Sequence, residues 1–137
     1  MELDALGVAT AADRITLAGP PARIRHSAVQ TLALALHELA TNARKYGALS
    51  AEGGRLSIEW QVRDAEDGEP WLSLDWIEHG ATAPAEANPA RRGYGRELIE
   101  EALPYSLGAR TRYDLGPDGA RCTIELPLER RERHRAA

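Results

Sequence analysis

Three polar residues in one short stretch of the sequence, Glu38, Asn42 and Lys45, have the types and the spacing to bind a metal-bound phosphate. In an α-helix with a rotation of about 100° per residue, their side chains project within roughly 60° of one another. Glu38 and Asn42 are four residues apart, so their side chains are neighbours on the helix surface. A carboxylate, an amide and an ammonium group on one face suit a bound cation and phosphate. The alternative is an ordinary solvated helix face, and the rest of the chain has to distinguish the two.

The helix that would carry these residues has an apolar stripe on its other side. The spacing of three and four residues along this stripe is typical of a helix packed against a core. Its members are Val29, Leu32, Leu36, Leu39, Ala40 and Ala43. We expect the helix to run from residue 28 to residue 46, with Ser27 as its N-cap and Gly47 at its end.

Alternating apolar and polar residues predict the strands that surround this helix. We expect a short strand within residues 13–19, two strands over residues 56–62 and 72–78, and a final hairpin formed by residues 110–115 and 121–128. A second helix should follow Gly93. Pro104 should kink or end that helix, unless it falls in the first turn of a following segment. Helices on one face of a mixed, mostly antiparallel sheet would cover every apolar face, which predicts a two-layer α/β sandwich.

Composition limits the classes of protein that the chain can belong to. Its 137 residues, 43% hydrophobic and 28% charged, are typical of one globular domain. The net charge of −4 argues against a protein that wraps nucleic acid. The single cysteine, Cys122, is expected to be a small core thiol, and the four histidines lack the spacing of a metal site. Without a long apolar run or a signal pattern, we expect a cytoplasmic protein with no membrane segment in this chain.

Two further motifs follow the polar helix in the sequence. A predicted strand ends in Trp76-Ile77-Glu78-His79-Gly80, where the carboxylate could accept a hydrogen bond from an adenine amino group and the glycine would leave room for the ring. His79 is expected to face solvent. After an alanine- and proline-rich loop over residues 80–92, Gly93 and Gly95 open a helix whose N–H groups could approach phosphate oxygens. Each motif is weak alone, but their order indicates a nucleotide site.

This order of motifs resembles the ATP-binding domain shared by gyrase, heat-shock chaperones, histidine kinases and mismatch-repair ATPases. It looks most like the catalytic domain of HWE-type histidine kinases, whose name refers to a histidine in the helix motif and a Trp-x-Glu in the first glycine motif. Here these residues are His37, Trp76 and Glu78. The stretches that match are LALALHELATNARKYGALS, RRGYGRELIEEAL and ARCTIELPL, and the resemblance extends from about residue 15 to residue 128. One departure is that Ala81 follows Gly80 where the family usually has a second glycine.

The resemblance implies a role for most of the polar residues. Asn42 would coordinate magnesium, and Glu38 would orient or deprotonate the nucleophile or position magnesium through water. Lys45 would contact phosphate, and Glu78 would accept a hydrogen bond from the adenine amino group. The other residues implied to lie at the nucleotide are Tyr46, Gly80, Gly93, Tyr94 and Gly95, with Arg91 or Arg92 as phosphate contacts from an ATP lid over about residues 80–92. His37 and Trp76 are family markers without an assigned role: His37 is either a structural histidine or has another function, and we do not expect it to be the phosphoacceptor.

The resemblance also implies how the chain functions. Residues 1–137 would form one ATP-binding catalytic domain, with a core over about residues 13–128 and flanking segments 1–12 and 129–137. It would use ATP and Mg²⁺ to phosphorylate a histidine. The surroundings of His26 do not resemble a phosphoacceptor motif, so we expect the acceptor in a separate phosphoacceptor domain, which would pass the phosphoryl group to a response regulator. The alternatives are a stand-alone serine kinase acting on a partner and a non-catalytic docking module of the same fold.

Overall fold

The computed structural model of the chain describes residues 14–50, 52–80 and 94–128. Five strands and one long helix account for most of these residues. The elements are β1 (Ile15–Ala18), α1 (His26–Lys45), the 3-10 turn η2 (Ala48–Ser50), β2 (Arg55–Asp64), β3 (Pro70–His79), α2 (Tyr94–Glu97), the π-helical turn η5 (Leu98–Ala102), α3 (Leu103–Leu107), β4 (Arg110–Gly116) and β5 (Gly119–Pro127).

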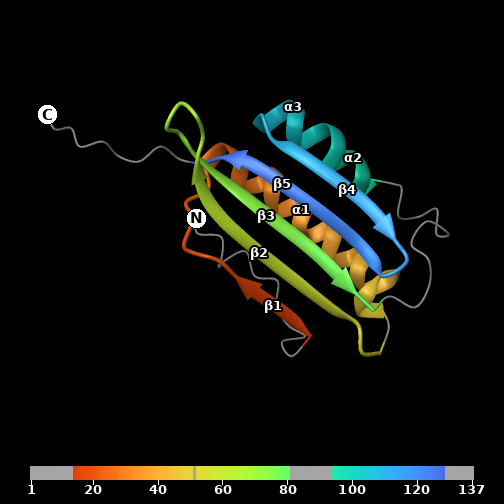
Figure 1. Cartoon of the computed structure of the whole chain (residues 1–137). Helices are drawn as coiled ribbons and strands as arrows, with labels where there is room; N and C mark the ends of the chain where they lie inside the picture. The colour runs from red at the N-terminus through yellow and green to blue at the C-terminus, as the bar shows by residue number, and fades with distance from the viewer. Residues whose placement is uncertain (1–13, 51, 81–93, 129–137) are drawn as a thin grey trace, which may run out of the picture.

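The strands form one five-stranded sheet in the order β1-β2-β3-β5-β4. The short edge strand β1 is parallel to β2, and the other neighbours are antiparallel. Figure 1 shows α1, α2 and α3 together behind one face of this sheet. The predicted two-layer α/β sandwich with a mostly antiparallel sheet is therefore confirmed.

The core lies between α1 and the sheet, because both present apolar side chains on one side only. In β2 the buried residues Leu56, Ile58 and Trp60 alternate with residues that are more exposed. In α1 the predicted stripe is buried at Leu32, Leu36, Leu39 and Ala43, while Val29 and Ala40 are partly buried against the same core. Cys122 is buried in β5, as expected of a core thiol.

The ends of the helices differ in detail from the sequence-based expectations. Ser27 is not the N-cap of α1, because the helix already begins at His26 and Arg25 occupies the cap position without a side-chain hydrogen bond. At the other end, the N–H groups of Tyr46 and Gly47 both donate to the backbone oxygen of Asn42, at 2.7 and 2.9 Å. The C-terminal end of the helix is therefore capped by backbone N–H groups.

Pro104 lies in the first turn of α3, directly after the π-helical turn η5. Proline is tolerated in a first helical turn because its missing N–H would have no partner within the helix there. The proline therefore does not end the helical segment, because it falls in the first turn of a following helix, which is one of the two outcomes expected from the sequence.

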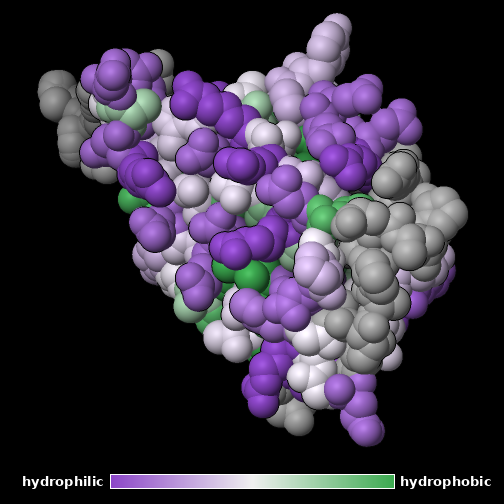
Figure 2. Space-filling model, turned by 45° about the vertical axis from the view of Figure 1, so that its right-hand side comes forward, coloured by the Kyte–Doolittle hydropathy of each residue, from purple (hydrophilic) through white to green (hydrophobic). Residues whose placement is uncertain are grey.

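The surface of the domain is mostly hydrophilic on the side shown in Figure 2, with small separate hydrophobic areas. The large hydrophobic residues that are exposed, among those the structure describes, are Leu17, Leu34, Val62 and Tyr105. Within the described ranges, no helix has both the length and the apolar character needed to cross a lipid bilayer.

Candidate functional site

The polar face of α1 is accessible from outside the core. Glu38 and Asn42 are partly exposed and Lys45 is exposed, whereas Leu39 and Ala43 on the other side are buried. His37 is exposed next to this face. Helix α1 is in contact with α2, which carries Gly95. The fold therefore packs α1 against the short helix that carries Gly95.

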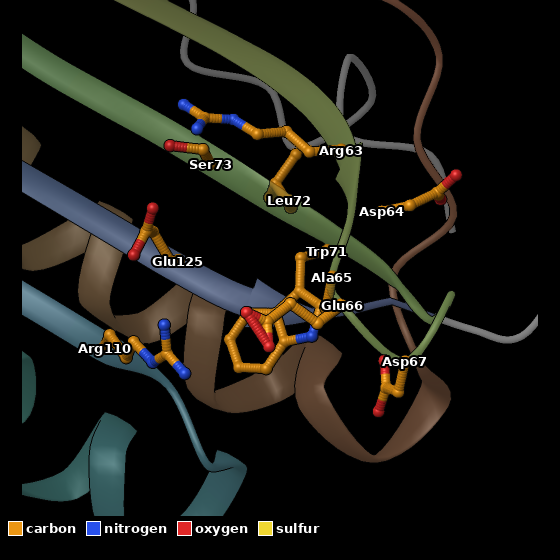
Figure 3. Close-up of a pocket in the computed structure, with 10 residues that line it drawn as sticks. All are labelled: Arg63, Asp64, Ala65, Glu66, Asp67, Trp71, Leu72, Ser73, Arg110 and Glu125. Carbon is orange, nitrogen blue, oxygen red and sulfur yellow. The ribbon is translucent and has the colours of Figure 1, made fainter.

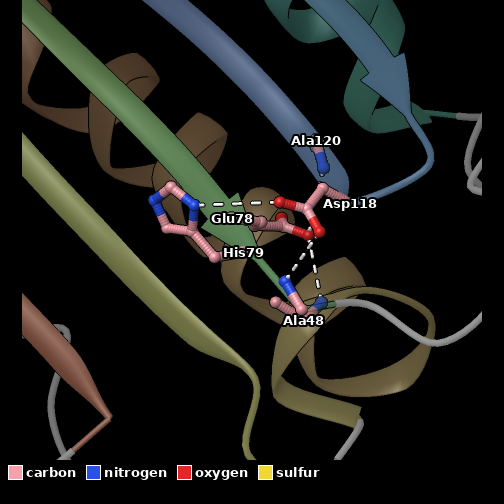
Figure 4. Close-up of polar contacts among 6 residues, drawn as sticks. Ala48, Glu78, His79, Asp118 and Ala120 are labelled. Carbon is pink, nitrogen blue, oxygen red and sulfur yellow. Dashed lines mark hydrogen bonds and ion pairs between the residues drawn. The ribbon is translucent and has the colours of Figure 1, made fainter.

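Glu78 is a buried carboxylate at the end of β3, with a relative exposure of 2%. Its Oε1 atom accepts hydrogen bonds from the backbone N–H groups of Ala48 and Ala120, at 3.2 and 3.3 Å (Figure 4). Its Oε2 atom accepts a hydrogen bond of 3.1 Å from the indole Nε1 of Trp76. Burial of a carboxylate is costly unless hydrogen bonds replace its water, and these three donors do so.

The three donors come from different parts of the chain and gather at one end of the sheet. Ala48 begins η2, just after the C-terminal end of α1, and Ala120 lies near the start of β5. Figure 1 shows the end of β3, the C-terminal end of α1 and the β4–β5 turn at this same end. Glu78 therefore ties the end of the helix motif to the sheet.

Two glycines permit the close packing around Glu78 and the end of β3. A Cβ atom on Gly119 would lie 2.6 Å from the Cβ of Glu78, and Gly119 has a φ of +131° that side chains disfavour. Gly80 has a φ of +85°, and a Cβ there would lie 3.2 Å from the Cα of Gly54. A larger residue at position 119 would collide with Glu78, and one at position 80 would crowd the backbone of Gly54.

The β4–β5 turn also holds the point at which β3 ends. The N–H of Gly80 donates to Oδ1 of Asp118 at 3.2 Å, and Nδ1 of His79 lies 3.9 Å from Oδ2 of the same carboxylate (Figure 4). Both His79 and Asp118 are exposed, so His79 is the solvent-facing residue expected from the sequence. The contacts anchor the chain immediately before residues 81–93.

Several predicted site residues cannot be compared with the structure. Ala81, Arg91, Arg92 and Gly93 lie outside the described residues. Tyr94 and Gly95 are placed as the first two residues of α2. Tyr46 is the partly exposed C-cap of α1.

Glu38 and Asn42 place a carboxylate and an amide on the same face of α1, and the oxygen atoms of these groups could bind a magnesium ion. Among the described residues, no group of three or more histidine, cysteine, aspartate and glutamate side chains could hold a metal ion. Magnesium typically binds one or two protein oxygens and completes its shell with phosphate oxygens and water. The side-chain oxygens of Glu38 and Asn42 match that pattern.

Sequence reasoning missed the donors that hold Glu78. The groups of Ala48 and Ala120 are backbone N–H groups, which every residue except proline possesses, so their residue types carry no signal. Arg96, which follows Gly95, was also not singled out. Its Nε donates to Glu100 Oε1 at 2.9 Å, and this hydrogen bond raises the pKa of the Arg96 guanidinium. Arg96 also lies 5.2 Å from the ring centroid of Tyr113, so it is engaged with β4.

A separate hollow of about 680 Å³ lies on the outer face of the sheet, beside the β2–β3 hairpin. Figure 3 shows Arg63, Trp71, Arg110 and Glu125 around it. The guanidinium of Arg110 lies 5.2 Å from the centroid of the Trp71 ring. None of the predicted site residues lines this hollow. It is therefore distinct from the candidate site around Glu78.

Solved structures with the same fold include a sensor histidine kinase and the catalytic domain of another histidine kinase. A mycobacterial sensor histidine kinase, MprB, matches with a TM-score of 0.59 and 16% identity over 86% of this chain and 83% of that one. The catalytic domain of the histidine kinase ThkA matches with a TM-score of 0.53 and 14% identity over 86% of this chain and 82% of that one. The chain therefore has the same fold as these histidine kinase domains.

Sequence relatives narrow this class. The blue-light-activated histidine kinase of Brucella anthropi is 37% identical over 115 residues, which are 84% of this chain and 23% of the relative. The blue-light-activated histidine kinase 1 of Erythrobacter litoralis is 39% identical over 122 residues, which are 88% of this chain and 32% of the relative. No protein-family model matches the chain. The chain is therefore a histidine kinase domain by homology, and it spans about a quarter to a third of the length of these relatives.

Proposed function

We propose that this domain is of the HWE type, binds Mg²⁺-ATP at the end of the sheet around Glu78, and transfers the γ-phosphoryl group to a histidine. The acceptor histidine would belong to a phosphoacceptor domain, and a response regulator would receive the phosphoryl group next. Family membership supports the class of reaction. The three family markers His37, Trp76 and Glu78 support the subtype.

One observation carries the proposed site. The carboxylate of Glu78 is hydrogen-bonded to the N–H of Ala48, three residues after the last residue of α1. This contact brings a candidate base-binding group to the end of the helix that presents Glu38, Asn42 and Lys45. A nucleotide needs a contact for its base and contacts for its phosphates within the length of one molecule, and the two groups of residues could supply them.

Each polar residue would have a specific task at the bound nucleotide. The carboxylate of Glu78 would accept a hydrogen bond from the amino group of adenine. The amide oxygen of Asn42 would bind the cation, and the ammonium group of Lys45 would attract the phosphates. Glu38 would orient the attacking imidazole nitrogen or accept its proton, since a general base must lie within hydrogen-bond reach of the group it deprotonates.

Phosphoryl transfer depends mostly on positioning and on neutralising charge. Bound magnesium would supply the positive charge that phosphate oxygens need during transfer. The protein groups would hold the nucleotide so that its terminal phosphate faces the acceptor. Tyr46 and the backbone of Gly80 and Gly95 would line the nucleotide site. Residues 80–92 would form the ATP lid, and Arg92 and Gly93 would contact the phosphates.

Titration calorimetry of the folded chain with ATP and Mg²⁺ tests the proposal. We expect binding that is lost in Asn42→Ala and retained in Gln30→Ala, a change at an exposed position on another face of α1. Folded wild-type protein that does not bind ATP would exclude the proposed site.

The acceptor requires a second assay, with a phosphoacceptor domain added in trans. An acid-labile phosphohistidine on that domain is expected. An acid-stable phosphoserine on a partner would instead identify a serine kinase, and ATP binding without any transfer would favour a docking module.

A further inference from the structure

We infer that Trp76 is a positioning residue for nucleotide binding, because its indole N–H holds the carboxylate of Glu78 in the orientation that presents it to the base. This inference rests on the proposed role of Glu78 and assigns a task to the tryptophan of the family motif. Trp76 itself would not touch the nucleotide. It would act only through Glu78.

The geometry of the pair is that of a fixed donor and a fixed acceptor. Trp76 and Glu78 are two residues apart on β3, so their side chains leave the same face of the sheet. Their relative exposures are 0% and 2%. The distance of 3.1 Å between Nε1 and Oε2 is that of a hydrogen bond, and a charged acceptor strengthens such a bond.

Both oxygens of the Glu78 carboxylate accept hydrogen bonds, and the indole N–H is the donor to one of them. Oε1 already accepts the N–H groups of Ala48 and Ala120. Trp76 donates to Oε2, so the plane of the carboxylate is held from both sides. Without the indole donor, only the two N–H groups on Oε1 would restrain the last side-chain torsion of Glu78, a torsion that is broad in unrestrained glutamates.

The ring of Trp76 cannot rearrange easily, because the core surrounds it. It lies opposite Ile58 on β2 and Cys122 on β5, both of which are buried. A residue at this position therefore has a fixed direction for its N–H. A phenylalanine would fill much of the same space without a donor, which separates the hydrogen bond from the packing.

Trp60 provides a matched control in the same sheet. It is also buried, and its Nε1 donates to the backbone oxygen of Pro20 at 2.6 Å, remote in sequence from the proposed site. Trp60→Phe removes an indole hydrogen bond from the core without changing a contact of Glu78. Comparison of Trp76→Phe with Trp60→Phe separates general loss of stability from loss of positioning.

The experiment measures ATP and GTP affinity of the wild type and both variants by calorimetry, together with unfolding by urea. We expect Trp76→Phe to bind ATP about tenfold more weakly and to prefer ATP over GTP less strongly. A tenfold loss corresponds to the low end of the range for one hydrogen bond to a charged group. Trp60→Phe should lose stability without losing the preference. A folded Trp76→Phe that retains both affinity and preference would overturn the inference while leaving the proposed function intact.

A second measurement on wild-type protein needs no variant. The chain has three tryptophans, Trp60, Trp71 and Trp76, and their indole N–H groups should give separate nuclear magnetic resonance signals. Addition of Mg²⁺-ATP should shift the Trp76 signal more than that of Trp60, because the acceptor of the Trp76 hydrogen bond gains a new partner. Saturation with ATP without this shift would overturn the inference, and wild-type protein that binds no ATP would overturn it together with the proposed function.

Discussion

The indole N–H of Trp76 donates a 3.1 Å hydrogen bond to Glu78, two residues further along β3, and both side chains are buried. The same carboxylate receives backbone N–H groups from the end of the helix motif and from β5. The motif from Trp76 to Glu78 on β3 thus connects the end of α1 and the start of β5, which are distant from it in sequence. Stability and nucleotide binding should both depend on it.

Replacement of Glu78 by alanine should lower the free energy of unfolding by about 3 kcal/mol, because three buried donors lose their acceptor. Glu78→Gln should cost less, since its amide oxygen can still accept two N–H groups. Urea unfolding measures both. The control is Glu59→Ala at an exposed position of β2, which should change stability by less than about 0.5 kcal/mol. A Glu78→Ala variant as stable as the control would contradict the bonding described around this carboxylate.

Gly119→Ala should destabilise the domain by about 3 kcal/mol, because the new Cβ would meet Glu78 and the backbone has a positive φ. Gly68→Ala separates these two causes. Gly68 also has a positive φ, of +84°, but nothing lies within 4 Å of its added Cβ, so we expect a loss of only about 1 kcal/mol. Urea unfolding compares the two variants, and equal losses would show that contact with Glu78 is unimportant.

Stability should fall at high pH because of Cys122. Burial raises the pKa of its thiol from 9.0 to about 12. Between these values the unfolded chain loses the proton and the folded chain keeps it, so rising pH favours unfolding. At pH 10 this difference is worth about 1.4 kcal/mol relative to neutral pH.

Cys122→Ala isolates this contribution, because its own pH dependence lacks the thiol. We expect the wild type to lose about 1.4 kcal/mol more than the variant between pH 7.5 and pH 10, measured by urea unfolding at each pH. The thiol should also react with a thiol reagent at pH 8 only after unfolding, because it is buried. Parallel pH curves for the two proteins would show that the thiol ionises in the folded state as readily as in the unfolded state.

Lys45→Ala should weaken ATP binding about tenfold and AMP binding much less, because an ammonium group at the outer phosphates contributes charge that AMP does not use. Arg44→Ala is the control, since Arg44 is also exposed and lies one residue away, on a different side of α1. Calorimetry with both nucleotides distinguishes the two. An equal loss in both variants would indicate a general effect of charge in place of a phosphate contact.

Local patterns predicted the elements of this fold well because they depend on neighbours in the chain. The apolar stripe containing Leu32 and Leu39 and the alternation of Leu56, Ile58 and Trp60 both follow from helical and strand periodicity. Ser27 was wrong as the N-cap because the backbone of Arg25 already begins the helix. The residue at which a helix begins depends on how the preceding chain approaches it. The type of a single residue such as Ser27 predicts that position only weakly.

The residue types and the order of motifs were enough to identify the polar helix face, the glutamate after Trp76 and the class of fold, because chemistry and periodicity are carried by side chains. Only the tertiary structure showed that Glu78 is buried and held by Ala48 and Ala120, which are 30 and 42 residues away. Those donors are backbone N–H groups, identical in almost every residue, so the sequence contains no mark of them. The role of Trp76 became visible for the same reason: its partner is defined by position in space.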